Sequence, residues 1–149
     1  MHRRTLAKLS LAAPALFLAR PAFAKEPEIY QEGGVAIDGS DTVGYFTQNG
    51  PVAGDASFTV DYKGATWRFA DQGSADAFAA NPAAYEPQFG GYCAWAVGQG
   101  YIASTTPEAW TIHNDKLYLN YSRGVRRRFE RNLEENIAKA EANWPRVLG

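Results

Sequence analysis

The residue of this sequence best suited to chemistry is its single cysteine, Cys93. It follows Gly90 and Gly91, a pair that lets the backbone turn tightly or approach another group closely. Residues 92–97 are compatible with a short helix that a following glycine ends, which predicts that Cys93 lies in the first helical turn. Free amide N–H groups and the helix dipole favour a thiolate there, so they lower the thiol pKa. Cys93 is therefore a candidate nucleophile and a candidate soft metal ligand.

Few residues could share a metal ion with Cys93. His113 is the only histidine outside the first 24 residues, and the pair could hold Cu(I) between a soft and a borderline ligand. Zinc would need further carboxylates, such as those of Asp38 or Asp41, or a site shared between two chains. Two structural alternatives stay open, because free cysteine is often a small buried hydrophobic residue and a histidine beside a turn is often solvated.

Three tyrosines indicate a second candidate feature. Tyr45, Tyr92 and Tyr118 each lie beside a predicted turn, and a tyrosine offers both an apolar ring and a polar hydroxyl. These residues predict a polar-lined pocket, whereas the general tendency of tyrosine rings is to pack in the core.

The charge balance excludes some classes of function. The chain has 15 Lys and Arg against 16 Asp and Glu, and four of the basic residues fall in the first 24 positions. The remaining chain is weakly acidic, which argues against nucleic-acid binding. The basic cluster 126–128 alternates with glutamates at helical spacing and predicts an ion-paired helix face. One cysteine also excludes an intrachain disulfide framework.

The first 24 residues are typical of an export signal. Arg3, Arg4 and Lys8 precede a short apolar run, and the segment ends in a small-residue pattern at Ala24. The adjacent arginines resemble a twin-arginine signal, although a basic start also suits general secretion. The run of about ten apolar residues is half the length of a membrane span. We expect an exported, periplasmic protein with no stable membrane insertion after cleavage.

The rest of the chain predicts a single α+β domain. Residues 25–33 lack periodicity and predict a flexible arm, and residues 35–37 and 43–46 predict short strands. Alternating apolar residues predict a hairpin over 58–62 and 65–69, followed by a helix over 75–80 that Ser74 caps.

Two further elements complete the expected fold. Residues 110–112 and 117–121 flank a turn at Asn114 and predict a second hairpin. An apolar residue at every fourth position predicts one amphipathic helix that Ser122 caps and that runs to about Ala142. The expected architecture is a small antiparallel sheet of hairpins with a short central helix and a C-terminal amphipathic helix.

Several motifs, in order, resemble an exported subfamily of YHS-domain proteins. Residues 64–69 and 78–85 resemble the YHS core, and 36–41, 90–94, 109–110, 116–121 and 143–145 resemble the exported subfamily. The resemblance spans residues 34–145 and implies an α+β domain linked to heavy-metal handling. The cysteines that usually bind metal in YHS domains are missing at 38–40 and 69–71, so only Cys93 carries over. Selenocysteine at that position in some relatives implies a chalcogen that takes part in chemistry.

Three functional hypotheses follow from these observations. In the first, Cys93 binds a soft metal ion, with copper as the expected cofactor, aided by His113 or by a second chain in a homodimer. In the second, Cys93 is the catalytic or sensing residue of a thiol redox protein whose partner is a small thiol. In the third, the chain is a non-catalytic partner-binding module, and Cys93 is only packed. The residues leave open whether the chain is an enzyme.

Overall fold

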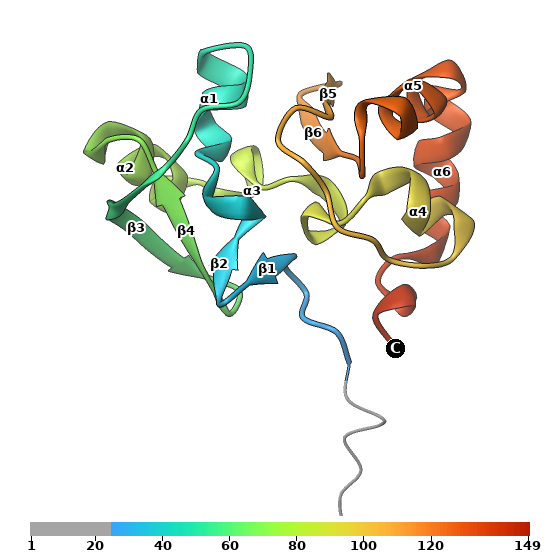
Figure 1. The fold of residues 1–149 in the computed structure, drawn as a ribbon, viewed down its shortest axis with the longest axis horizontal. Coiled ribbons are helices and arrows are strands. Elements are labelled where there is room, and N and C mark those ends of the chain that lie inside the picture. Colours follow the sequence, from blue (N-terminus) through green and yellow to red (C-terminus); the bar gives the residue numbers. More distant parts are fainter. Residues whose placement is uncertain (1–24) are drawn as a thin grey trace, which may run out of the picture.

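The computed structural model describes residues 25–149, which form a small α+β fold with two hydrophobic cores. Figure 1 shows two halves that lie side by side. One contains most of the strands together with short helices, and the other is mainly helical. The expected fold class is confirmed. The expected export signal, residues 1–24, lies outside the described residues. Within residues 25–149, no helix has the length and apolar character needed to cross a membrane.

A four-stranded sheet forms the first half, in the order β1-β2-β4-β3. The strands are β1 (Gln31–Glu32), β2 (Val35–Ala36), β3 (Asp55–Tyr62) and β4 (Ala65–Phe69). The β3–β4 pair is the antiparallel hairpin that alternation predicts, and β2 joins β4 as a parallel neighbour. The N-terminal segment differs from the expected arm, because Ile29 is fully buried and Tyr30 nearly so. Apolar side chains at these two positions dock the segment onto the domain.

Helix α2 (Gln72–Ala80) covers the sheet through one aromatic side chain. The Phe78 ring lies 4.8 Å from that of Trp67 and 5.0 Å from that of Phe69, measured between centroids. The expected helix is confirmed, but it starts three residues earlier, because Asp71 rather than Ser74 caps it. The Asp71 carboxylate accepts a hydrogen bond from the Ser74 amide at 2.8 Å. The short helix α3 (Pro82–Tyr85) follows.

The strand expected at residues 43–46 is wrong, since helix α1 (Thr42–Thr47) occupies this segment. Asp41 caps the helix by accepting from the Gly44 amide at 3.2 Å, and its other oxygen accepts from the Ala70 amide at 3.0 Å. A Cβ at Gly44 would lie 2.6 Å from a Val52 methyl carbon. Capping and close packing thus override the strand preference of the local residues.

The second half packs a hairpin against three helices (Figure 1). These are β5 (Trp110–His113) and β6 (Lys116–Leu119), with α4 (Ala94–Gln99), α5 (Arg123–Arg131) and α6 (Leu133–Asn143). Short 3-10 helices lie at Ile37–Gly39, Gln88–Gly91 and Arg146–Leu148. The hairpin is confirmed.

The single C-terminal helix expected from the apolar stripe is wrong, because the chain breaks at Asn132 into α5 and α6. Asn132 has non-helical angles of φ −133° and ψ 59°. The buried Asn136 amide donates to the carbonyls of Arg128 and Phe129, which satisfies two of the last carbonyls of α5. The expected cap is confirmed, since the Ser122 hydroxyl accepts from the Val125 amide.

Candidate functional site

Cys93 is the N-cap residue of α4, immediately before the helix in which its sulfur was expected. The helix ends at Gly100, whose left-handed φ of 99° suits glycine. The preceding Gly90 and Gly91 also have positive φ, and a Cβ at Gly90 would collide with the Glu28 carbonyl oxygen. The glycine pair therefore allows the close backbone approach that was expected, and it sets the entry to α4.

The Cys93 sulfur lies in a hydrogen-bonded corner between α4 and the end of β6. The Tyr121 amide donates to Sγ at 3.2 Å, and Sγ lies 3.4 Å from Asn120 Oδ1, which can accept the thiol proton. The same Asn120 oxygen accepts from the Trp95 amide at 3.0 Å. Asn120 is fully buried, and its Nδ2 has no hydrogen-bond partner in the part of the chain described.

The expected lowering of the thiol pKa is wrong. Burial raises the pKa of the Cys93 thiol, and the amides of Ala96, Tyr121 and Trp95 only partly oppose this rise. Only 1% of Cys93 is exposed, so a negatively charged sulfur here would lack most of the hydration that it has in water. The amide donors expected at a helix start are present, but desolvation has the larger effect.

A cavity of about 200 Å³ reaches Cys93 from the surface. The side chains that line it beside Cys93 are largely apolar, and none is charged. They belong to Trp95, Ala96, Tyr101, Ala103, Tyr121 and Val125. Among the described residues, Tyr101 and Tyr121 are the large hydrophobic residues that are exposed to solvent, at 51% and 57%. Cys93 is thus part of the lining of an apolar cavity with two exposed tyrosines.

The structure does not bring His113 to Cys93. His113 Nε2 pairs with Glu134 Oε2 at 2.9 Å, and its strand partner is Lys116. Lys116 lies at the opposite end of β6 from Asn120, so about 13 Å of strand separates the two places. Across residues 25–149, no three His, Cys, Asp or Glu side chains are grouped so that they could hold a metal ion.

The three candidate pocket tyrosines do not surround one cavity. Tyr45 belongs to the first core and donates to the Pro107 carbonyl at 2.8 Å, while Tyr92 and Tyr118 belong to the second core. The Tyr92 hydroxyl donates to the Pro27 carbonyl at 2.7 Å. The rings of all three tyrosines are buried, and the hydroxyls of Tyr45 and Tyr92 are hydrogen-bonded within the domain. Packing and these hydrogen bonds are therefore their roles in the structure.

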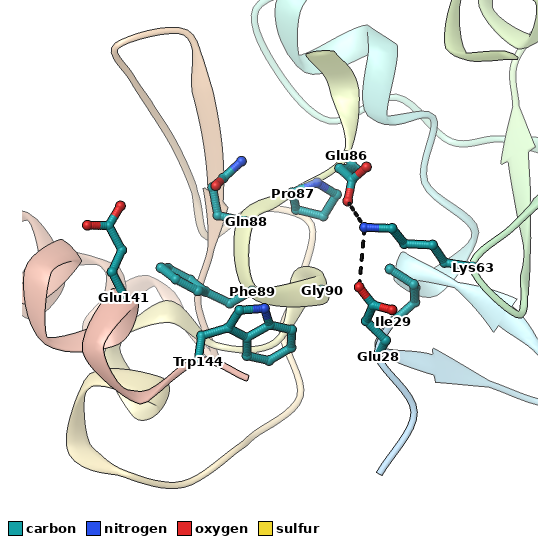
Figure 2. A pocket seen from close by; sticks show the side chains of 10 residues that line it. All are labelled: Glu28, Ile29, Lys63, Glu86, Pro87, Gln88, Phe89, Gly90, Glu141 and Trp144. Carbon is teal, nitrogen blue, oxygen red and sulfur yellow. Dashed lines mark hydrogen bonds and ion pairs between the residues drawn. The ribbon is translucent and has the colours of Figure 1, made fainter. Parts of the chain in front are cut away.

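Another cavity, of about 250 Å³, lies between the sheet and the C-terminal helix (Figure 2). On one side, Lys63 Nζ pairs with Glu28 at 3.2 Å and with Glu86 at 3.0 Å. On the other side, Figure 2 shows Trp144 and Glu141. The only cation of its lining is already paired, and neither Cys93 nor His113 takes part.

Sequence reasoning missed the partners of Cys93. Asn120 and Tyr121 come from the end of β6, 27 and 28 positions further along the chain. The only signal for them is that two polar-tipped residues follow an apolar strand. Tyr101 and Val125 have no signal at all, because their roles depend on how α4 and α5 pack.

The comparisons with known proteins found no matching family, no similar curated protein and no similar solved structure. The resemblance to exported YHS-domain proteins therefore stays a prediction from the sequence motifs.

Proposed function

We propose that this chain is a thiol redox protein or sensor that acts through the Cys93 sulfur. The observation that carries the proposal is the position of that sulfur. It faces backbone amides that can stabilise a thiolate, and Cys93 is among the residues that line a cavity large enough for a small reactant. A cysteine that is only packed needs neither feature.

The proposed step is thiol–disulfide exchange with an external partner. The Cys93 thiol loses its proton, and the thiolate attacks one sulfur of a disulfide. The sulfur–sulfur bond of that disulfide breaks, and the second sulfur leaves as a thiolate that takes up a proton. The chain has one cysteine, so a thiol from another molecule must resolve the resulting mixed disulfide and return Cys93 to its reduced form.

Within this step, the chain's own groups have distinct roles. Asn120 Oδ1 holds the thiol proton in the resting state, at a sulfur–oxygen distance of 3.4 Å. The Tyr121 amide, at 3.2 Å, remains directed at the sulfur when the proton has left. Hydrogen bonds to an ionised acceptor are about twice as strong as neutral ones, so this contact strengthens as the thiolate forms.

Soft-metal binding, with copper as the expected ion, is the competing proposal. Its weak point is the second ligand, because the contacts of the sulfur are backbone amides and an amide oxygen, which are poor partners for Cu(I). A site shared between two chains would supply a second cysteine. The expected export signal suits the redox proposal, because disulfides persist in the periplasm, and the YHS resemblance suits the metal proposal, because YHS domains accompany metal handling.

The test is the accessibility of Cys93 in the native protein. Reduced protein is treated at pH 8 with methyl methanethiosulfonate, a small uncharged reagent that leaves a mixed disulfide, and the adduct is followed by intact mass. We expect one adduct that dithiothreitol removes and that Cys93→Ser lacks. Modification only after denaturation would refute the redox proposal and support a packed cysteine.

A parallel titration separates the metal proposal. Reduced protein competes with a chromophoric Cu(I) chelator, with Cys93→Ser as the control. Binding of one Cu(I) per one or two chains that disappears in Cys93→Ser would favour the metal site. Equal competition by both proteins would refute the metal proposal.

A further inference from the structure

The cavity beside Cys93 restricts what can reach its sulfur. Its volume of about 200 Å³ exceeds the cavity of about 150 Å³ that accepts benzene in an engineered protein. One ring-sized group therefore fits, whereas a peptide-sized thiol such as a tripeptide would leave most of its atoms outside.

The chemistry of the lining is selective as well. No charged side chain lines the cavity, and the nearby Arg128 guanidinium stacks on the Trp95 ring, 5.5 Å from its centroid. A charged group inserted here would lose its hydration without gaining a partner. An uncharged ring or branched alkyl group would instead bury its surface against Trp95, Tyr101 and Tyr121.

A buried polar side chain, Asn120, lies beside the sulfur but is not among the residues that line the cavity. The fully buried Asn120 side chain lies against the sulfur through its oxygen, yet its Nδ2 donors are unpaired among the described residues. Unpaired buried donors are rare in folded proteins.

From these observations we infer that the reactant of Cys93 is an uncharged, apolar disulfide that places one ring-sized group between Tyr101 and Tyr121. The inference rests on the proposed thiol exchange and adds the class of substrate. Cys93 attacks the sulfur that carries the apolar group, and the other sulfur leaves as a thiolate.

The test compares three methanethiosulfonates on the purified full chain. They carry a benzyl group, an anionic sulfonatoethyl group and a cationic trimethylammonioethyl group, and all release methanesulfinate. Each rate at pH 8 is divided by the rate of the same reagent with N-acetylcysteine, which removes intrinsic reactivity. We expect the benzyl reagent to exceed both charged reagents by at least tenfold. Tyr101→Ser should reduce this preference several-fold, and Tyr101→Phe, which keeps the ring, should retain it.

The outcomes separate the two proposals. Equal normalised rates for the three reagents, or a preference for either charged one, would overturn the apolar substrate and leave thiol exchange standing. An unchanged preference in Tyr101→Ser would overturn the role of the tyrosine. If the native protein reacts neither with these three reagents nor with methyl methanethiosulfonate, thiol exchange itself is refuted.

Discussion

Asn120→Asp is the substitution that most directly tests the geometry around Cys93. It replaces a neutral oxygen 3.4 Å from the sulfur with a carboxylate oxygen while the size of the side chain hardly changes. At an effective dielectric constant near 20, two unit charges at this distance repel by about 5 kcal/mol. This energy corresponds to a rise of about 3.5 units in the thiol pKa. The hydrogen bond from the Trp95 amide and partial protonation of the new carboxylate both weaken the repulsion. We therefore expect the thiol pKa to rise by at least about two units.

The assay is the rate at which methyl methanethiosulfonate forms a mixed disulfide with the native protein at pH 8. A rise of two pKa units lowers the thiolate fraction about a hundredfold, but the more basic thiolate is more nucleophilic, so the net rate falls about tenfold. Asn114→Asp is the matched control, because it makes the same change on the exposed turn at the far end of the hairpin. Circular dichroism confirms that both variants fold. A folded Asn120→Asp protein that reacts as fast as Asn114→Asp would refute the placement of Asn120 against the sulfur.

Three further predictions address the metal proposal, helix capping and alkaline stability. His113→Ala loses only the exposed pair with Glu134, so we expect unchanged Cu(I) competition; a loss would place His113 in a metal site. Asp71→Ala should lower the free energy of unfolding by about 1 kcal/mol in urea titrations, and Ser74→Ala should have a smaller effect, because Asp71 is the cap. Burial raises the pKa of five tyrosines, so the unfolded chain releases their protons at lower pH than the folded chain. The contribution of these tyrosines to stability should therefore be constant well below pH 10 and fall above it, and an unchanged urea midpoint from pH 9 to pH 11 would contradict this. These residues are Tyr30, Tyr45, Tyr62, Tyr92 and Tyr118.

The hairpins were predictable because their signal is local. Alternation in β4 places Ala65, Trp67 and Phe69 in the core, and the turn residues Lys63 and Gly64 both adopt positive φ. Helix α1 was not predictable in this way. Its residues favour a strand, and the carboxylate of Asp41 ties the helix start to Ala70, 29 positions later in the chain. Such a contact has no signature within the segment itself.

The C-terminal break shows a different limit of periodicity. An apolar residue at every fourth position continues through Asn132, because α5 and α6 both bury their stripes in the same core. The break depends on the side chain of Asn136, which pairs with the last carbonyls of α5 instead of facing solvent. A repeat of apolar residues cannot reveal that choice.

For the site, the sequence located the sulfur but not its surroundings. The glycine pair and the helix start indicated amide donors near Cys93, and the structure has them. The sign of the pKa shift depends on burial, which residues from β6 and α5 complete. The amides of Trp95 and Ala96 belong to the local sequence, whereas the Tyr121 amide and the larger desolvation reach the sulfur only in the folded protein.

A raised pKa does not by itself disable Cys93. Each unit of increase cuts the thiolate fraction tenfold near neutral pH, but the nucleophilicity of the thiolate rises about threefold, so the net rate falls only about threefold. A cavity that binds an apolar disulfide beside the sulfur raises its local concentration by more than this factor even when binding is weak. Charged oxidants gain no such benefit and meet a protonated, buried thiol. In the proposed exchange, burial therefore makes Cys93 slow towards hydrophilic reactants and selective for apolar ones.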